Sequence, residues 1–225
     1  MFSADQGVVA GGDPDWSKVS ILLHFDGTNG STTITDSSSN NRTFTASGAT
    51  LSTSQKKFGT ASLAVGTNND AYTTASLGVN TQNFTLEGWV YFASFSDWVG
   101  SPFTIGTSSW LSANSMCPLF GSTVVRMSIG SSYYDFTHGM SANTWYHFCI
   151  QRSGNSWYMY RDGTQIGSTV TNSTSLSASN FYVNGTSDQG DMPNSSYVDE
   201  VRLTVGTTRY NLSGFTAPTA AFPNG

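Results

Sequence analysis

The chain has 225 residues, a net charge of −5 and only 10% charged side chains. Its nine Lys and Arg residues are scattered, so the clustered basic surface that nucleic-acid phosphates require is absent. No apolar run is long enough to span a bilayer, which excludes membrane insertion through a helix. An aromatic content of 13% is too high for a disordered chain.

The chain is expected to form one domain, because no linker divides it. Residues 1–16 are rich in glycine and lack periodicity, so we expect a flexible or docking arm there. This segment also lacks the basic start and apolar core of a signal peptide, and secretion is not indicated. Residues 17–212 are expected to form the domain, and residues 213–225 an extended tail laid over its surface.

Alternating apolar and polar residues predict short strands along the whole domain. The clearest are Val19–Phe25, Leu63–Val65, Ala71–Ala75, Phe84–Phe92, Val124–Ile129, Trp145–Arg152, Ser156–Arg161, Phe181–Asn184 and Tyr197–Val205, with weaker candidates at Thr43–Ala46, Phe103–Ile105 and Tyr134–Thr137. Turn signals separate them, and Asp162-Gly163 is a strong two-residue hairpin signal. A dozen short antiparallel strands predict an all-β, two-sheet jelly-roll sandwich or a related one.

The last predicted strand, in the stretch SYVDEVRLTVGTTRY, places an acid among apolar residues. Strict alternation puts Asp199 on the same face as Tyr197, Val201, Leu203 and Val205. A carboxylate on a core-facing position must be paired, protonated or bound to a cation, because an isolated buried charge is very costly.

Glu200 and Arg202 share the opposite face of this strand. We expect them to join Glu87, Arg152 or His147 in a partly buried charge network, with the floor of a ligand groove as the alternative interpretation. Cys117 and Cys149 are the only cysteines, and the sequence does not decide whether they pair.

Aromatic residues in loop-rich segments are candidates for stacking on sugar rings. Trp98, Trp110, Tyr133 and Tyr134 lie in such segments, and core packing is the alternative for each of them. Trp89, Trp145 and Trp157 lie within strand patterns and are predicted to be core residues.

Five motifs follow one another along the chain: ILLHFDG, FGTASLAV, FTLEGWVYF, WYHFCIQRSGNSWYMYRDGTQIG and YVDEVRLTVGTTRY. In this order they resemble the laminin-G-like, concanavalin A-like lectin/glucanase superfamily, and in particular such jelly-roll domains in bacteriophage structural proteins. The resemblance spans about Val19 to Pro218 and implies a two-sheet jelly roll whose first and last strands are adjacent.

That adjacency, together with the structural calcium found in related domains, implies one candidate Ca²⁺ site. The expected ligands are Asp26 and Asp199, with Asp36 or Asn68 as weaker additions. In the alternative interpretation, Asp26 caps a turn and Asp199 accepts backbone N–H bonds.

The resemblance extends to glucanases, which cleave glycosidic bonds with two carboxylates. The enzymes of the family carry an E-x-D-x-E pattern on one strand, but this chain has only two glutamates, Glu87 and Glu200. No zinc-ligand spacing of histidines, nucleophile elbow or phosphate-binding glycine loop occurs either. We therefore expect no enzymatic activity, with a lyase that uses Tyr and His as the alternative.

The expected function is that of a non-enzymatic virion surface protein, a head decoration or a tail-fibre component whose lectin-like domain binds host-surface glycans. The expected partners are capsid or tail proteins, and a homo-oligomer is one way to attach the domain. Such a protein is assembled in the host cytoplasm. The alternatives are a capsid cement protein without glycan binding and a bacterial carbohydrate-binding or adhesion module.

Overall fold

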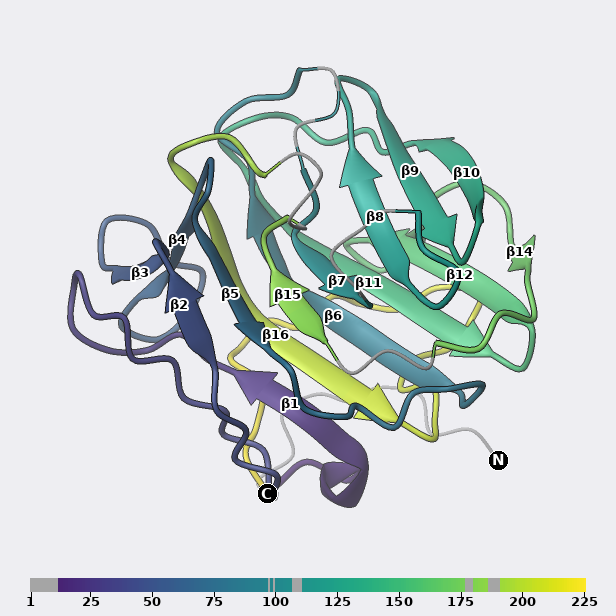
Figure 1. Cartoon of the computed structure of the whole chain (residues 1–225), viewed down its shortest axis with the longest axis horizontal. Coiled ribbons are helices and arrows are strands. Elements are labelled where there is room, and N and C mark those ends of the chain that lie inside the picture. The colour runs from purple at the N-terminus through teal and green to yellow at the C-terminus, as the bar shows by residue number, and fades with distance from the viewer. Residues whose placement is uncertain (1–11, 97, 99, 107–110, 177–179, 186–190) are drawn as a thin grey trace.

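Two antiparallel sheets packed face to face make up the protein in a computed structural model (Figure 1), which describes residues 12–96, 98, 100–106, 111–176, 180–185 and 191–225. The nine-stranded sheet contains β1 (Val19–Leu23), β3 (Thr50–Ser52), β4 (Ser62–Val65), β6 (Phe84–Tyr91), β11 (Trp145–Ser153), β12 (Ser156–Arg161), β13 (Thr164–Gln165), β14 (Val170–Thr171) and β16 (Ser196–Val205). The seven-stranded sheet contains β2 (Thr45–Ser47), β5 (Asp70–Thr73), β7 (Phe103–Ile105), β8 (Met116–Phe120), β9 (Val124–Ile129), β10 (Ser132–Thr137) and β15 (Phe181–Val183).

The architecture confirms the predicted two-sheet jelly-roll sandwich, and β1 lies beside β16 as expected. A single turn of 3-10 helix, η1 (Trp16–Lys18), leads into β1. In the described part of the chain, no helix is long and apolar enough to cross a membrane.

Aromatic rings fill the space between the sheets. Phe84 of β6 meets Trp157 of β12 edge to face at 5.4 Å, and Phe103 of β7 stacks on Phe148 of β11 at 5.9 Å. Pairs of buried rings add to the hydrophobic stabilisation that their area alone provides. The prediction that Trp157 is a core residue is therefore confirmed.

Most predicted strands form within two residues of their expected bounds, and the Asp162-Gly163 turn joins β12 to β13. Three strands were not predicted: β3, β8 and β14. In β8 the sequence MCPLF contains Pro118, which argues against a central strand. The pairing of β8 with β7 is limited to Met116. Pro118 lies outside this pairing, so its missing N–H removes no hydrogen bond between β8 and β7.

A β-bulge in β16 makes the alternation predicted for this strand wrong. Asp199 lies opposite Trp89 of β6 and Arg202 opposite Glu87, so β16 carries one extra residue between these pairs. Glu200 occupies the bulge in the left-handed region, with φ of 50°.

The bulge reverses which side chains point inward. Val198, Val201 and Leu203 belong to the core, whereas Asp199 and Arg202 both lie on the outer face of the nine-stranded sheet. Strict alternation had placed Asp199 on the same face as Val201, Leu203 and Val205. The bulge places it on the opposite face.

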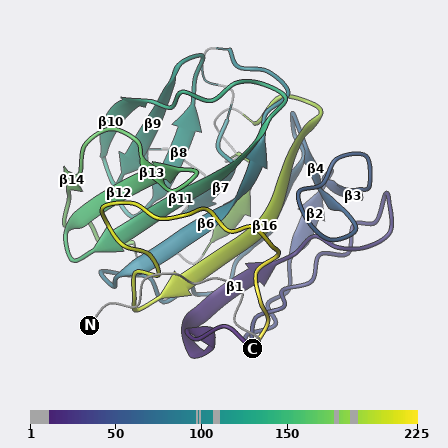
Figure 2. The same ribbon diagram turned by 180° about the vertical axis from the view of Figure 1, so that it is seen from behind.

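The C-terminal segment, residues 211–225, crosses the outer face of the nine-stranded sheet (Figure 2). We call this segment the tail. Phe215 stacks on Tyr210 with the ring centroids 3.9 Å apart, and the ring of Phe222 covers the guanidinium of Arg202 at 3.9 Å. The amide of Phe222 also donates to Glu200 at 2.8 Å.

The described end of the expected N-terminal arm packs against the same face. Asp13 is buried, and its amide donates to the carbonyl of Asn224 in the tail at 3.2 Å. Residues 1–11 lie outside the described part of the chain. Cys117 of β8 and Cys149 of β11 are both buried free thiols, which answers the question that the sequence left open.

Candidate functional site

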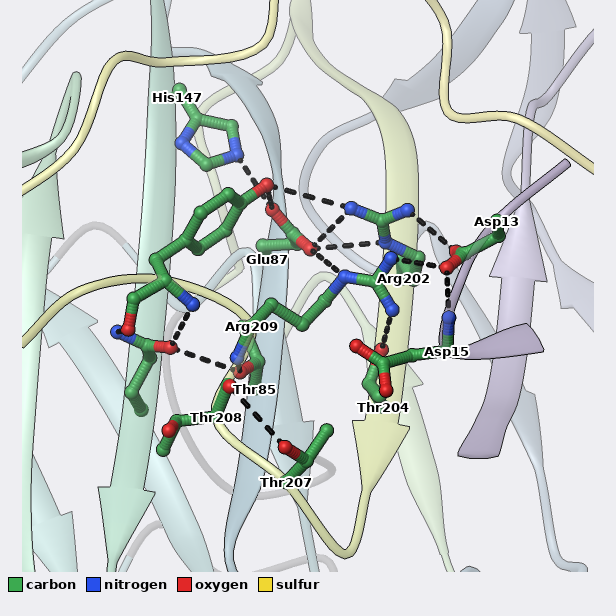
Figure 3. A network of polar contacts seen from close by, with 12 residues as sticks. Asp13, Asp15, Thr85, Glu87, His147, Arg202, Thr204, Thr207, Thr208 and Arg209 are labelled. Carbon is green, nitrogen blue, oxygen red and sulfur yellow. Dashed lines mark hydrogen bonds and ion pairs between the residues drawn. The ribbon is translucent and has the colours of Figure 1, made fainter. Parts of the chain in front are cut away.

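The outer face of the nine-stranded sheet carries a charge network centred on Glu87 (Figure 3). Arg202 donates to one carboxylate oxygen of Glu87 from two nitrogens, at 3.0 and 2.8 Å. His147 lies 3.1 Å from the other oxygen, and the hydroxyl of Tyr210 donates to that same oxygen at 2.7 Å. The predicted network of Glu87, His147 and Arg202 therefore exists, and its members come from three neighbouring strands.

The network extends to the N-terminal arm through Asp13. Arg202 donates to Asp13 at 2.9 Å, and Arg209 forms a second ion pair with the same carboxylate. Arg152, which was a candidate member, lies elsewhere and donates instead to the backbone carbonyls of Gly154, Asn80 and Thr174.

The electrostatics of Glu87 oppose a role in proton transfer. Burial raises the pKa of this carboxyl group, but Arg202 and His147 outweigh burial and hold the pKa well below its ordinary value. Burial also raises the pKa of Tyr210 well above its ordinary value. A general acid needs a pKa near the working pH, and the downward shift of Glu87 is opposite to the upward shift that this role requires.

Glu200, in the bulge of β16, holds the tail through the amide of Phe222 and through His24. Its two carboxylate oxygens lie 3.0 Å from Nδ1 of His24, while Nε2 of His24 lies 3.1 Å from the side-chain oxygen of Asn224. Burial lowers the pKa of His24, but the hydrogen bond and charge of Glu200 reverse this effect, and the net shift is upward. Glu200 therefore does not share the network of Arg202, contrary to the prediction.

The residues predicted to bind calcium hold backbone amides. Asp26 accepts the amide and the hydroxyl of Thr60, and Asp199 accepts the amides of Lys57 and Phe58 at 2.7 and 3.1 Å. Both carboxylates therefore fasten the loop between β3 and β4, as the alternative interpretation expected. Burial raises the pKa of Asp199 to about 8, against the opposing effect of these amides.

The two weaker calcium candidates have other partners. Asp36 accepts the amides of Leu22, Ser38 and Arg42, and the amide of Asn68 donates to Asp191. Within the described residues, no three His, Cys, Asp or Glu side chains form a group that fits a metal ion. The four predicted ligands thus do not converge on one point, and a bound calcium ion stays a prediction.

The predicted aromatic residues include one exposed cluster. Trp98 and Tyr133, which are 36% and 51% exposed, both contact the guanidinium of Arg126, with 4.2 Å between each ring centroid and the guanidinium carbon. Arg126 forms a bidentate ion pair with Asp135, in which two guanidinium nitrogens each donate to one carboxylate oxygen at 2.7 Å. We call these four residues the aromatic clamp.

The other aromatic residues singled out in the sequence do not belong to the aromatic clamp. Tyr134 follows Tyr133 in β10 and therefore points to the other side, where it packs against the core. Trp110 lies outside the described residues. Trp145, predicted to be a core residue, is instead partly exposed on the outer face of β11 beside Tyr91. Alternation in β11 places Trp145 on the same face as the polar residues His147 and Gln151. This pattern in the sequence could have indicated that Trp145 faces outward.

The sandwich of two antiparallel sheets defines a concanavalin A-like jelly roll. The sequence model of the family described as the concanavalin A-like lectin/glucanases superfamily matches residues 65–206, and the chain belongs to this family. A search of curated proteins finds no match.

Solved structures with the same fold include two kinds of domain. Domain 4 of the extracellular arabinanase AbnA from Geobacillus stearothermophilus, solved with arabinotriose, is 16% identical with a TM-score of 0.62, and the match covers 88% of this chain and 94% of that one. The botulinum neurotoxin serotype D binding domain is 10% identical with a TM-score of 0.63, over 86% of this chain and 49% of that one.

A type C botulinum neurotoxin structure, whose description states that cell entry depends on two ganglioside molecules, is 12% identical with a TM-score of 0.58. That match covers 84% of this chain and 48% of the toxin chain. This chain thus spans about half the length of the toxin structures. At these identities, the likeness concerns the fold alone.

Proposed function

We propose that this chain is a non-enzymatic, lectin-like module that binds glycans through the aromatic clamp. The observation that carries the proposal is the position of Trp98 and Tyr133, which are the exposed large hydrophobic side chains of the described residues. Exposed rings that lie together mark surfaces that meet a partner, and a sugar ring presents an apolar face that stacks on them.

The clamp is organised before any ligand arrives. Arg126 fixes the two rings through cation–π contacts, and Asp135 fixes Arg126 through two charge-assisted hydrogen bonds. Rigid rings lose little entropy on binding, which favours affinity. Arg126 lowers the pKa of Asp135 through its hydrogen bond, so that the ionised carboxylate stays an acceptor for sugar hydroxyl groups.

Substitution of the two rings tests this proposal. A glycan array identifies a ligand, and calorimetry then measures its affinity for Trp98→Ala and Tyr133→Ala. Each change is expected to weaken binding about 30-fold, the effect of a hot-spot ring worth about 2 kcal/mol, while the melting temperature stays unchanged.

The matched control is Tyr182→Ala on the same outer face of the seven-stranded sheet, where Tyr182 pairs with Tyr72. It is expected to keep full affinity. Unchanged binding in both clamp variants, or an equal loss in the control, would refute the clamp as the site.

The absence of enzymatic activity is part of the proposal, and the position of the two glutamates supports it. Glu87 is locked by three donors, and Glu200 is held by His24 and the tail. Both lie beneath the tail, where a polysaccharide does not reach them. Release of reducing sugar from the bound glycan would contradict this part.

We place the module on the surface of a bacteriophage virion, as a head decoration or tail-fibre component. The motif order and the final strand motif support this placement. Electron cryomicroscopy of the particle tests it: density for the sandwich with the clamp facing outward is expected, and a clamp buried against the capsid would favour a cement protein.

A further inference from the structure

A row of aromatic side chains crosses three strands on the outer face of the nine-stranded sheet. Tyr91 of β6 lies directly opposite Trp145 of β11 and Tyr197 of β16 in the strand register. The ring centroids are 5.5 and 5.7 Å apart along the row, and all three side chains are partly exposed. Figure 2 shows the three strands side by side on this face, with the tail crossing it.

Two hydrogen-bonding groups lie beside this row, one buried and one exposed. The indole N–H of Trp145 is buried without a partner. Asn143 accepts the hydroxyl of Tyr91 at 3.2 Å through its side-chain oxygen, and no partner is found for its amide nitrogen in the described part of the chain. An exposed ring surface can stack on the apolar face of a sugar, and a polar side chain beside it can bond to a sugar hydroxyl group.

A lysine without an acidic partner lies beside the row, although the protein as a whole is acidic. All nine Lys and Arg residues are described, and seven of them hold an acid or backbone carbonyls through their charged groups. Among the described residues, neither a hydrogen bond nor an ion pair is found for the charged groups of the other two, Lys56 and Lys57.

Lys57 lies at the edge of the aromatic row. Its ammonium nitrogen is 3.8 Å from the ring centroid of Trp89, which precedes Tyr91 by two positions on the same face of β6. The amide of Lys57 donates to Asp199, two residues after Tyr197 of the row. The backbone of Lys57 is therefore held in place, while its ammonium group has no acidic partner among the described residues.

We propose that the row of Trp145, Tyr91 and Tyr197, together with Lys57, is a second binding site, for glycans that carry a carboxylate. The rings would stack on the sugar and Lys57 would pair with its acid group. This site lies on the sheet opposite to the aromatic clamp, so it is independent of the glycan site proposed above. Two sites on opposite faces would make one chain bivalent, and linked sites raise avidity.

Titration with defined oligosaccharides tests this second site. The acidic probes are 3′-sialyllactose and tetragalacturonate, and lactose is the neutral probe. The full chain is expected to bind at least one acidic probe more tightly than lactose. Lys57→Met, which keeps the apolar stem over Trp89, is expected to weaken that binding about tenfold or more, because a charge-assisted hydrogen bond is lost.

Three further variants separate the explanations. Lys18→Met removes a lysine that pairs with Asp15 and is expected to bind like the unmodified chain. Lys57→Arg is expected to retain binding, which excludes misfolding as the cause of a loss. Trp98→Ala removes a clamp ring and is expected to leave acidic-probe binding unchanged.

Four results would overturn the second site. They are no binding of either acidic probe, equal binding of lactose, wild-type affinity in Lys57→Met, or loss of acidic-probe binding in Trp98→Ala.

Discussion

Replacing Arg202 with methionine tests whether the network beneath the tail stabilises the fold. Arg202 is 4% exposed and holds Glu87 and Asp13, while the ring of Phe222 covers its guanidinium. Methionine keeps much of the side-chain volume and its contact with Phe222 but removes the charge. The two carboxylates then stay in a buried place with fewer donors, which costs far more than the loss of an exposed pair.

The expected loss follows from the contacts that remain. Breaking a buried ion pair costs about 3–5 kcal/mol when one partner is left uncompensated. Arg209 still pairs with Asp13 and lies 3.8 Å from Glu87 in Arg202→Met, so the lower end applies. A loss of about 3 kcal/mol lowers the melting temperature by roughly 6–12 °C in a chain of this size.

Urea unfolding and scanning calorimetry at pH 7 measure this loss. The control is Arg126→Met, which breaks an exposed ion pair and is expected to cost at most about 1 kcal/mol. The double variant with Glu87→Gln is expected to be less unstable than the sum of its single changes, because it removes the orphaned charge. A loss in Arg202→Met no larger than in the control would refute the reasoning.

Two other predictions concern the fastenings of the tail. Because Glu200 raises the pKa of His24, this pair stabilises the fold fully below the unfolded pKa of about 6.5, and the stabilisation is lost as the pH rises through the folded pKa. His24→Gln is therefore expected to flatten the fall in urea midpoint between pH 6 and pH 9, and an unchanged slope would exclude the pair. A side chain at Gly163 would collide with the carbonyl of Phe215, so Gly163→Ala is expected to release the tail for limited proteolysis. Gly154→Ala has a similar positive φ with nothing within 4 Å and is expected to leave the tail protected; equal cleavage of both variants would refute the fastening.

The sequence predicts those parts of the fold that depend on local pattern. Asp162-Gly163 marks a hairpin because few residue pairs adopt its backbone, and the alternation in β9 and β12 marks their bounds. The bulge in β16 was missed because strict alternation was assumed there. The spacing of the apolar residues could have indicated the bulge. Val198 and Val201 are three positions apart, whereas Val201 and Leu203 are two apart, as in a regular strand.

The candidate sites depend on contacts between distant residues, which a single sequence does not give. Trp98 and Tyr133 were chosen for their loop-rich surroundings, but Arg126, which brings them together, lies in a strand and carries no local signal. Trp145 was assigned to the core because an aromatic residue in a strand usually faces inward. Only the pairing of β11 with β6 reveals the row on the outer face.

The contact between Asp13 and Asn224 also determines how the protein responds to mechanical force. A load that separates these two residues acts on their hydrogen bond, on the ion pairs that hold Asp13 to Arg202 and Arg209, and on the tail, and not along the ladder between β1 and β16. Phe222 and then Phe215 would leave their places one after the other, because contacts loaded in sequence break singly. The tail would lengthen under tension while the two sheets stay intact.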